Sequence, residues 1–171
     1  MSRRPLEWLR ISEKETRRYW SKVAQPDAET GCMVWLGYVS SVGYGRFNAR
    51  RGGRTLTVPL DAHRVGFILA GGTLDADSVV DHICLNRACQ NPTHLRPATL
   101  GQNQQHRTGA NRNSRSGARG VIPDRDKWRV QIGFEGRTIG VGTYATVEEA
   151  QEAATAARLE LLPYAHPEMR R

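Results

Sequence analysis

Residues 79–107 contain most of the side chains in this chain that can bind a metal ion. Three of the five histidines and two of the three cysteines lie in this segment, together with an aspartate and several asparagines. This density is too high for an ordinary solvated loop. We therefore predict that residues 79–107 form a functional site and that the rest of the chain supports it.

The pattern within this segment predicts a strand, a turn, a second strand and a helix. Residues 79–82 are expected to form a strand that ends at Asp81 and His82. Pro92 begins a second turn, and the helix starts at residue 99 or 100 and runs to about residue 107. Asn103 lies on this helix, with His106 and Arg107 on neighbouring faces by the spacing of three and four residues.

The chain before this segment predicts two helices and several short strands. Residues 12–24 begin with the Ser-x-x-Glu spacing of a capping box and precede a proline, so they predict a helix. Residues 31–38 and 43–47 flank a Ser/Gly turn and predict a hairpin, and residues 56–60 add a strand. Residues 61–70 begin with an aspartate that can cap a helix and end before two glycines.

The chain after this segment has a different character. Residues 108–118 are rich in Gly, Asn, Ser and Arg without apolar periodicity, so we predict a flexible basic linker. Apolar and polar residues alternate at 128–132, and residues 137–144 return as a second strand after a Glu-Gly turn. A second capping box at Thr146 opens an alanine-faced helix that ends before Pro163.

These elements predict an α+β protein with two small domains. We place the first domain at residues 1–107, the linker at 108–118, and at 119–171 a three-stranded antiparallel sheet packed on one helix. The chain has 171 residues, of which 39% are hydrophobic, and this fraction can fill small cores but not a large one.

The charge of the chain favours a polyanionic partner. Lys and Arg number 25 against 17 Asp and Glu, which gives a net charge of +8. Nucleic acid is therefore the leading candidate partner, and solubility alone is the alternative explanation. No segment approaches the roughly 20 apolar residues of a membrane span, so we expect a soluble, cytoplasmic protein without a membrane partner. The odd number of cysteines in a reducing compartment favours metal binding over a disulfide.

Asp81 and His82 have the chemistry of a metal-dependent hydrolase. A carboxylate can bind a hard cation while the neighbouring imidazole takes a proton from water. If Asn103 supplies a second oxygen ligand, Mg²⁺ or Mn²⁺ fits this pair. The alternative is that Asp81 caps a turn and His82 is an ordinary half-buried histidine.

The order of these motifs resembles the HNH endonuclease family, in particular its phage-type homing endonucleases. The similarity rests on Asp81-His82, on residues 91–95 and on Asn103, and extends over roughly residues 17–107. It implies a ββα-metal nuclease domain in which Asp81 and Asn103 bind the cation and His82 is the general base. His94 takes the central His/Asn position of the family. Arg64 and Arg107 are weaker candidates for phosphate clamps.

The cysteines predict a second, structural metal site. Cys84, Cys89 and His94 have the spacing of zinc ligands, and Cys32 is the one remaining cysteine that can complete the set. His94 then has two competing roles, in the zinc site or in the nuclease site. We favour zinc, because a soft tetrahedral site prefers thiolates and imidazole while the catalytic cation prefers oxygen. For Cys32 the alternative is a small buried apolar residue.

Residues 116–162 resemble the plant ethylene-response-factor (APETALA) type of DNA-binding domain. That family lays a three-stranded sheet in the major groove of double-stranded DNA. By position, the groove-facing residues are Arg119, Lys127, Arg129 and Gln131. Plant members have two arginines and a tryptophan where this chain has Asp124, Thr138 and Gly140, so their sequence preference is not expected here. The alternative is an ordinary solvated sheet face.

Together these features predict a metal-dependent HNH DNA endonuclease with a C-terminal DNA-binding domain. The competing hypothesis is a non-catalytic regulator that binds DNA and uses zinc only for stability. Such a regulator has no need for Asp81, His82 and Asn103 together. An RNA-binding protein is disfavoured, because the chain lacks a cluster of exposed stacking aromatics. The sequence makes no prediction of the oligomeric state.

Overall fold

The protein was analysed as a computed structural model that describes residues 11–50, 57–75, 77–107 and 109–165. The chain divides into two compact units, Met1–Leu100 and Gly101–Arg171, which are described separately below. Short antiparallel sheets and helices confirm the predicted α+β class. The domain limits inferred from the sequence stay predictions. Among the described helices, none has the length and hydrophobicity that crossing a membrane requires.

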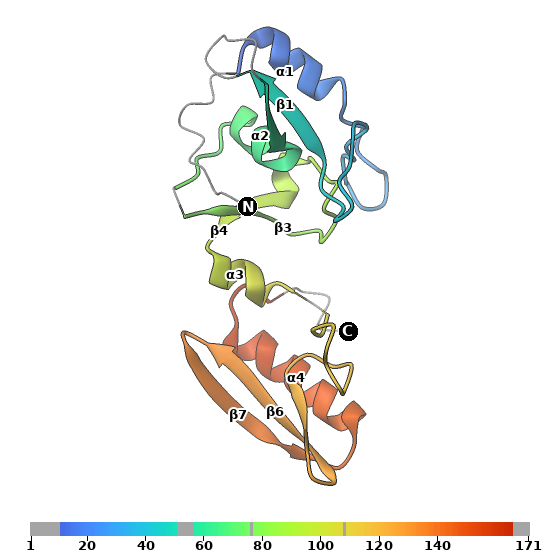
Figure 1. The fold of residues 1–171 in the computed structure, drawn as a ribbon, viewed down its shortest axis with the longest axis vertical. Helices are drawn as coiled ribbons and strands as arrows, with labels where there is room; N and C mark the ends of the chain where they lie inside the picture. The colour runs from blue at the N-terminus through green and yellow to red at the C-terminus, as the bar shows by residue number, and fades with distance from the viewer. Residues whose placement is uncertain (1–10, 51–56, 76, 108, 166–171) are drawn as a thin grey trace. The chain divides into compact units, whose positions relative to one another are not determined.

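The described part of the first unit contains two two-stranded antiparallel sheets with two α-helices (Figure 1). Its elements in chain order are α1 (Glu13–Trp20), β1 (Arg46–Arg50), β2 (Thr57–Asp61), α2 (Ala62–Leu69), β3 (Val79–His82), the 3-10 helix η1 (Pro92–His94) and β4 (Leu95–Ala98). Strand β1 pairs with β2, and β3 pairs with β4. The second pair and α2 position the candidate site.

Helix α1 begins at the predicted capping box but ends earlier than expected. The Ser12 hydroxyl accepts a hydrogen bond from the Glu15 N–H, and the Glu15 carboxylate accepts one from the Ser12 N–H. The helix stops at Trp20 because the next residues turn away to pair with another segment. Val23 forms a β-bridge with Trp35, so these residues are not available to extend the helix.

The predicted hairpin of residues 31–38 and 43–47 is correct at its turn and wrong beyond it. The Arg46 N–H donates to the Tyr38 carbonyl and the Ser40 N–H to the Tyr44 carbonyl, each at 2.9 Å. The earlier arm pairs elsewhere, since Val34 forms its bridge with Cys89. The main partner of β1 is β2, which confirms the strand predicted at residues 56–60 for the part that the structure describes.

An aromatic core holds the elements of the first unit together. The Tyr19 ring lies 5.2 Å from that of Trp35 and 5.4 Å from that of Phe47, between centroids. The Tyr19 hydroxyl donates to Oε1 of the fully buried Gln90 at 2.6 Å, which fixes the chain beside Cys89. A Cβ at Gly66 would lie 2.2 Å from the Tyr19 hydroxyl, so only glycine permits α2 to approach this closely.

The second unit is a three-stranded antiparallel sheet with one long helix on one face (Figure 1). Its elements are α3 (Leu100–Gln105), which starts at the unit boundary, β5 (Val121–Asp124), β6 (Lys127–Phe134), β7 (Arg137–Tyr144) and α4 (Val147–Leu161). The strand order is β5-β6-β7. The small Ala150 and Ala154 are fully buried, and this lets α4 pack closely on the sheet.

The alternation predicted for the middle strand is confirmed. Val130 and Ile132 are 0% and 4% exposed and face α4, whereas Lys127 and Arg129 are exposed on the other face. The second capping box is also present, with Glu149 and Thr146 bonded to each other's main-chain N–H groups. One face of β6 is thus apolar and buried, and the other is polar and accessible.

Candidate metal and nuclease site

The three cysteines and His94 meet in one cluster in the first unit. The ligand atoms of Cys32, Cys84, Cys89 and His94 all lie within 4.8 Å of one another. His94 Nδ1 is 3.7 Å from the Cys32 sulfur and 3.6 Å from the Cys89 sulfur. In a tetrahedral zinc site, sulfur and nitrogen ligands at ordinary bond lengths lie about 3.6 Å apart. The donor set and its spacing therefore fit a structural zinc ion.

Local turns bring these ligands together. The chain turns sharply after β3, where Leu85 adopts a φ of 60°, and returns through Cys89. The Asn91 side chain caps η1, which carries His94, by accepting from the Thr93 N–H at 3.0 Å. The same side chain donates to the Gly31 carbonyl at 2.7 Å, beside Cys32. Asn91 therefore connects the two segments that supply the cluster.

The surroundings of Cys89 favour a thiolate. A hydrogen bond from the Cys84 thiol, with further bonds from the main-chain N–H groups of Asn91 and Met33, lowers the pKa of Cys89 well below that of a free thiol. The contact with Cys89 and burial raise the pKa of the Cys84 thiol. A bound cation stabilises a thiolate that lies beside a second thiol, because metal binding also releases the proton of the second thiol.

His82 is held in a defined orientation at the end of β3. Its side chain is 5% exposed, and its Nε2 lies 3.1 Å from the main-chain carbonyl oxygen of Cys89. A carbonyl only accepts hydrogen bonds, so Nε2 carries the proton and Nδ1 keeps the lone pair. Burial lowers the pKa of His82, against the opposing effect of the Cys89 carbonyl. A neutral imidazole with an accepting Nδ1 can act as a general base.

Two further rings pack beside His82. His63, in the first turn of α2, is 5% exposed and its ring centroid lies 4.6 Å from that of His82. The Tyr44 ring lies 5.2 Å from His63 and 6.0 Å from His82. Neither residue was assigned a role from the sequence. Both lie within residues 17–107, over which the chain resembles the HNH family, and this is the signal that could have identified them.

Asp81 is buried next to His82 and paired with a cation. Its side chain is 5% exposed, and its Oδ2 accepts from Nε and Nη2 of Arg96, both at 2.9 Å. The two residues lie opposite each other in the β3–β4 register. Arg96 is a third residue to which the sequence assigned no role. Its guanidinium places a positive charge against the Asp81 carboxylate.

Arg64 follows His63 on α2 and is half-buried. Its Nε is buried without a hydrogen-bond partner among the described residues. Burial lowers the pKa of Arg64, while the nearby Asp61 opposes this effect. A partly desolvated guanidinium with an unused donor is suited to binding a phosphate.

Asn103 and Arg107 belong to the second unit. Asn103 is half-buried on α3, and Arg107 is exposed just beyond the end of that helix. Their assigned roles, a second metal ligand and a phosphate clamp, stay predictions.

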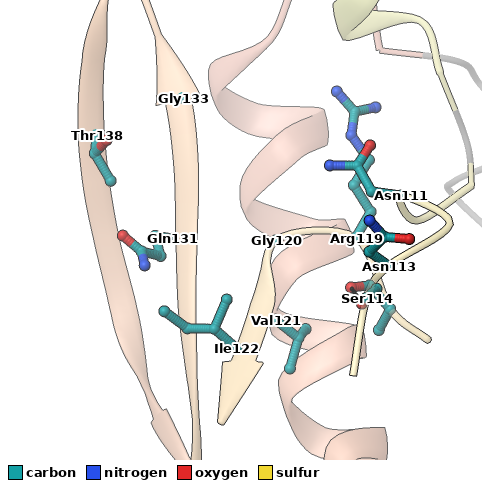
Figure 2. A pocket seen from close by; sticks show the side chains of 11 residues that line it. Asn111, Asn113, Ser114, Arg119, Gly120, Val121, Ile122, Gln131, Gly133 and Thr138 are labelled. Atoms are coloured by element: carbon teal, nitrogen blue, oxygen red, sulfur yellow. Dashed lines mark hydrogen bonds between the residues drawn. The ribbon is translucent and has the colours of Figure 1, made fainter. Parts of the chain in front are cut away.

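The polar face of the second unit carries three of the four predicted DNA-contacting residues. Lys127, Arg129 and Gln131 alternate along β6 on the face opposite α4, and Arg129 lies 3.8 Å from Asp124. A pocket of about 440 Å³ lies beside this face. Figure 2 shows Asn111, Asn113 and Ser114 on one side of the pocket, with Gln131 and Thr138 on the other.

Arg119, the fourth of these residues, bonds to the end of α3. Its guanidinium donates to the carbonyls of Gln104 at 2.8 Å and Gln105 at 3.2 Å, and also to that of Arg107. Burial, followed by the nearby Arg107, lowers the pKa of Arg119. The side chain thus supplies donors to carbonyls that a helix C-terminus leaves unsatisfied. A DNA contact by Arg119 stays a prediction.

Comparison with known proteins gives one match. Residues 61–105 match the family model described as HNH endonuclease. The matched part contains α2, β3, β4 and α3, and therefore includes Asp81, His82, His94 and Asn103. The match supports an HNH nuclease domain in this part of the chain, and thereby a metal-dependent enzyme that acts on nucleic acid. No curated protein and no solved structure matches the chain.

Proposed function

We propose that the protein is an HNH endonuclease that hydrolyses phosphodiester bonds of double-stranded DNA with Mg²⁺ or Mn²⁺. The observation that carries the proposal is the hydrogen bond between His82 Nε2 and the Cys89 carbonyl, because it leaves Nδ1 as a proton acceptor on the residue that follows Asp81. The family match over residues 61–105 supports the same chemistry. Cleavage of DNA and reduced cysteines suit a cytoplasmic protein.

The chemical step assigns His82 the role of general base. Nδ1 takes a proton from water as the water oxygen forms a bond to phosphorus. The bond from phosphorus to the departing 3′ oxygen breaks, and that oxygen leaves with the electron pair. Arg64 supports the step by binding a non-bridging oxygen, since its buried Nε has no partner among the described residues.

Asp81 and Asn103 are the proposed ligands of the catalytic cation. Carboxylate and amide oxygens suit a hard divalent ion, which neutralises charge on the phosphate and on the departing oxygen. Arg96 holds the Asp81 carboxylate in place from the opposite strand. His94 is assigned to the zinc site, because its Nδ1 lies within 3.7 Å of two cysteine sulfurs.

The second unit is the proposed targeting module. An exposed polar strand face with Lys127, Arg129 and Gln131 offers donors to phosphates and base edges, and the chain has a net charge of +8. The resemblance of residues 116–162 to the ethylene-response-factor type of domain supports this role. The resemblance of the first unit to phage-type homing endonucleases supports a site-directed nuclease.

The Asp81–Arg96 ion pair also favours a second candidate function. A carboxylate that accepts two bonds from one guanidinium can serve the fold alone. In that case the protein is a DNA-binding regulator that the zinc cluster stabilises, and His82 is a packed core histidine. A regulator of this kind would bind DNA and leave it uncleaved.

A plasmid-cleavage assay separates the two functions. Supercoiled plasmid is incubated with the purified protein, with and without Mg²⁺, beside His82→Ala and a control, His166→Ala, which changes a histidine outside residues 61–105. An endonuclease cleaves the plasmid with Mg²⁺, and His82→Ala lowers the rate by about 10²- to 10⁴-fold while binding is kept. If the wild type and both variants bind DNA but leave the plasmid uncleaved, the protein is the regulator and not the nuclease.

A further inference from the structure

The hairpin of residues 38–46 exposes large apolar side chains on an ordered backbone. Tyr38 is 74% exposed and Val42 is 52% exposed. Two main-chain hydrogen bonds of 2.9 Å join the arms, and Gly43 closes the turn with a φ of 88°. Large apolar side chains that are exposed together on one surface mark a site of interaction with a partner.

Tyr38 shares a face of the hairpin with Tyr44, whose ring lies near the candidate base. Residues paired across a hairpin alternate between two faces, so Tyr38 lies on the face that carries Tyr44. The Tyr44 ring lies 6.0 Å from that of His82. Gly45, the residue after Tyr44 on the second arm, points to the opposite face and towards the core. A Cβ there would lie 2.7 Å from the Trp35 side chain. Val39 forms a bridge with Gly45 and lies on the opposite face from Tyr38.

A cation accompanies this apolar surface. Arg87 is exposed, and its Nη1 donates to the Val42 carbonyl at 2.9 Å. Its guanidinium lies 5.4 Å from the centre of the Tyr44 ring. Apolar side chains next to a positive charge suit the bases and backbone of a nucleic acid better than an uncharged partner surface.

We propose that this hairpin is a DNA wedge, in which Tyr38 packs against the bases beside the cleaved phosphate and Arg87 pairs with a neighbouring phosphate. The inference rests on the proposed function, because a phosphodiester at His82 places its flanking nucleotides over the hairpin. Successive nucleotides of one strand are about 3.4 Å apart along the duplex, so Tyr44 lies within a few nucleotides of the reacting phosphorus. Val42 contributes apolar contact at the tip.

Affinity for a random-sequence duplex, measured across a salt series, tests the wedge. His82→Ala serves as the background for every protein, so that the DNA stays intact. Adding Tyr38→Ala weakens binding about ten- to a hundred-fold at every salt concentration with an unchanged salt slope, because a neutral ring displaces no counterions. Tyr38→Phe keeps the affinity. Arg87→Gln lowers the salt slope by about 0.9, the value for one phosphate contact. The matched control is Val39→Ala, which leaves binding unchanged.

A base contact has a second signature. Duplexes with 2-aminopurine in place of adenine become more fluorescent when the wedge disturbs base stacking, and Tyr38→Ala removes this increase. If Tyr38→Ala binds as tightly as its parent, the inference is overturned, and the proposed function stands as long as the wild-type protein cleaves plasmid. If Tyr38→Ala instead abolishes self-association in sedimentation equilibrium and leaves DNA affinity unchanged, the surface belongs to a second copy of the chain and the wedge is overturned. DNA binding that depends on Tyr38 without any cleavage by the wild type keeps the base contact of the hairpin, but overturns the nuclease and with it the placement of the wedge beside a cleaved phosphate.

Discussion

His82 and Cys89 are joined by a hydrogen bond of 3.1 Å from the imidazole Nε2 to the main-chain carbonyl oxygen. Cys89 also contributes its sulfur to the Cys/His cluster, 3.6 Å from His94 Nδ1. One residue therefore connects the candidate base to the candidate zinc site. Because the bond orients the imidazole, the geometry of the zinc cluster and the activity of His82 should depend on each other.

Loss of one zinc ligand is expected to remove both the metal and the activity. Cys84→Ser should lower the zinc content from about one ion per chain towards none and destabilise the first unit, since metal binding contributes directly to folding. Plasmid cleavage should fall with it, because the Cys89 carbonyl then no longer holds His82. Elemental analysis, thermal unfolding and plasmid cleavage measure the three effects.

The control for this prediction is His106→Gln, which changes a buried histidine outside the cluster. It should keep its zinc. Protein that is well folded and free of zinc, both as wild type and as Cys84→Ser, would contradict the zinc assignment and return His94 to the nuclease site.

The stability of the first unit should decrease below neutral pH because of His63. Burial, and then the nearby His82, lowers the pKa of His63 well below its ordinary value of 6.5. The unfolded chain takes up the proton near pH 6.5 while the folded protein does not. Stability is therefore present above about pH 6.5 and is lost as the pH falls. Urea unfolding between pH 5.5 and 7.5 measures this slope.

His63→Phe should flatten the pH dependence by up to about 1.4 kcal/mol per pH unit, since phenylalanine fills the space without binding a proton. The zinc cluster also responds to pH, but it is common to both proteins, so their difference isolates His63. If the free energy of unfolding depends on pH equally in the wild type and in His63→Phe, the pKa of His63 is not lowered in the folded protein.

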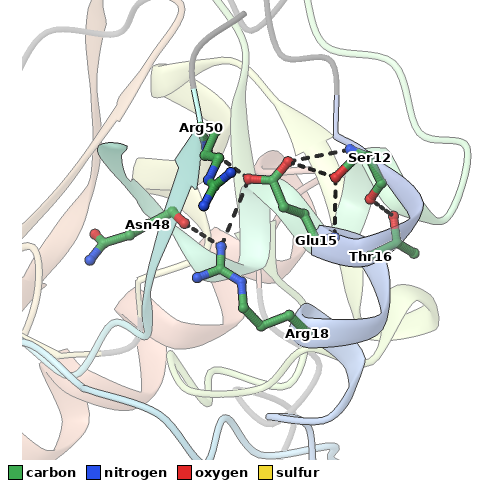
Figure 3. A network of polar contacts seen from close by, with 6 residues as sticks. All are labelled: Ser12, Glu15, Thr16, Arg18, Asn48 and Arg50. Carbon is green, nitrogen blue, oxygen red and sulfur yellow. Dashed lines mark hydrogen bonds and ion pairs between the residues drawn. The ribbon is translucent and has the colours of Figure 1, made fainter. Parts of the chain in front are cut away.

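The Glu15 carboxylate is a second source of acid sensitivity (Figure 3). Its Oε1 accepts from the Arg50 N–H at 2.8 Å and its Oε2 from the Ser12 hydroxyl at 3.1 Å. Burial acts to raise the pKa of Glu15, but the bonds from Arg50 and Ser12, with the charge of Arg18, lower it overall. The stabilisation is present above the unfolded pKa of about 4.3 and is lost as the pH falls through the lower folded value.

Replacement by glutamine tests this network at neutral pH. Glu15→Gln should lower the free energy of unfolding by about 1–3 kcal/mol, since two acceptor sites of a charged group are weakened. The matched control is Glu13→Gln, whose side chain is 92% exposed in the same helix, and which should change stability by less than about 0.5 kcal/mol. Equal effects of the two variants would mean that the charge of Glu15 contributes nothing specific.

Features that depend on nearby residues were predictable from the sequence. Both capping boxes, at Ser12 and Thr146, are present, and the strand alternation at residues 128–132 gives the buried and exposed faces as expected. The gathering of Cys32 with the other three ligands is an exception, since these residues are distant in sequence and were predicted together because Cys32 is the one remaining cysteine.

Features that depend on distant pairing were not predictable. The arm expected to complete a hairpin instead pairs Val34 with Cys89, and no local pattern identifies that partner. The packing of His63 against His82 likewise depends on how α2 lies against β3. Arg96 could be placed opposite Asp81 only once the register of β3 and β4 was known.

The exposed strand face of the second unit should contribute to DNA affinity. Arg129→Ala is expected to weaken binding to a preferred site by about 1–3 kcal/mol if the guanidinium binds a guanine, with little effect on random DNA. Arg137→Ala is the control, because Arg137 is exposed but pairs with Phe134 on the other face of the sheet. A salt series on both DNAs distinguishes base contact from phosphate contact, since a phosphate contact weakens both alike. Unchanged binding by Arg129→Ala would remove this face from the targeting role.

Arg119 should affect stability more than it affects DNA binding. Its guanidinium donates to the Gln104 and Gln105 carbonyls at the end of α3, where a positive charge is also favoured by the helix dipole. Arg119→Ala should therefore destabilise the second unit by about 1–3 kcal/mol, whereas Arg125→Ala, in the exposed turn before β6, should not. Amide hydrogen exchange of β6 measures the stability of this unit without interference from the first. If Arg119→Ala keeps full exchange protection and loses DNA affinity, the arginine contacts DNA. Lost protection with the DNA affinity retained at low temperature identifies it as a helix cap.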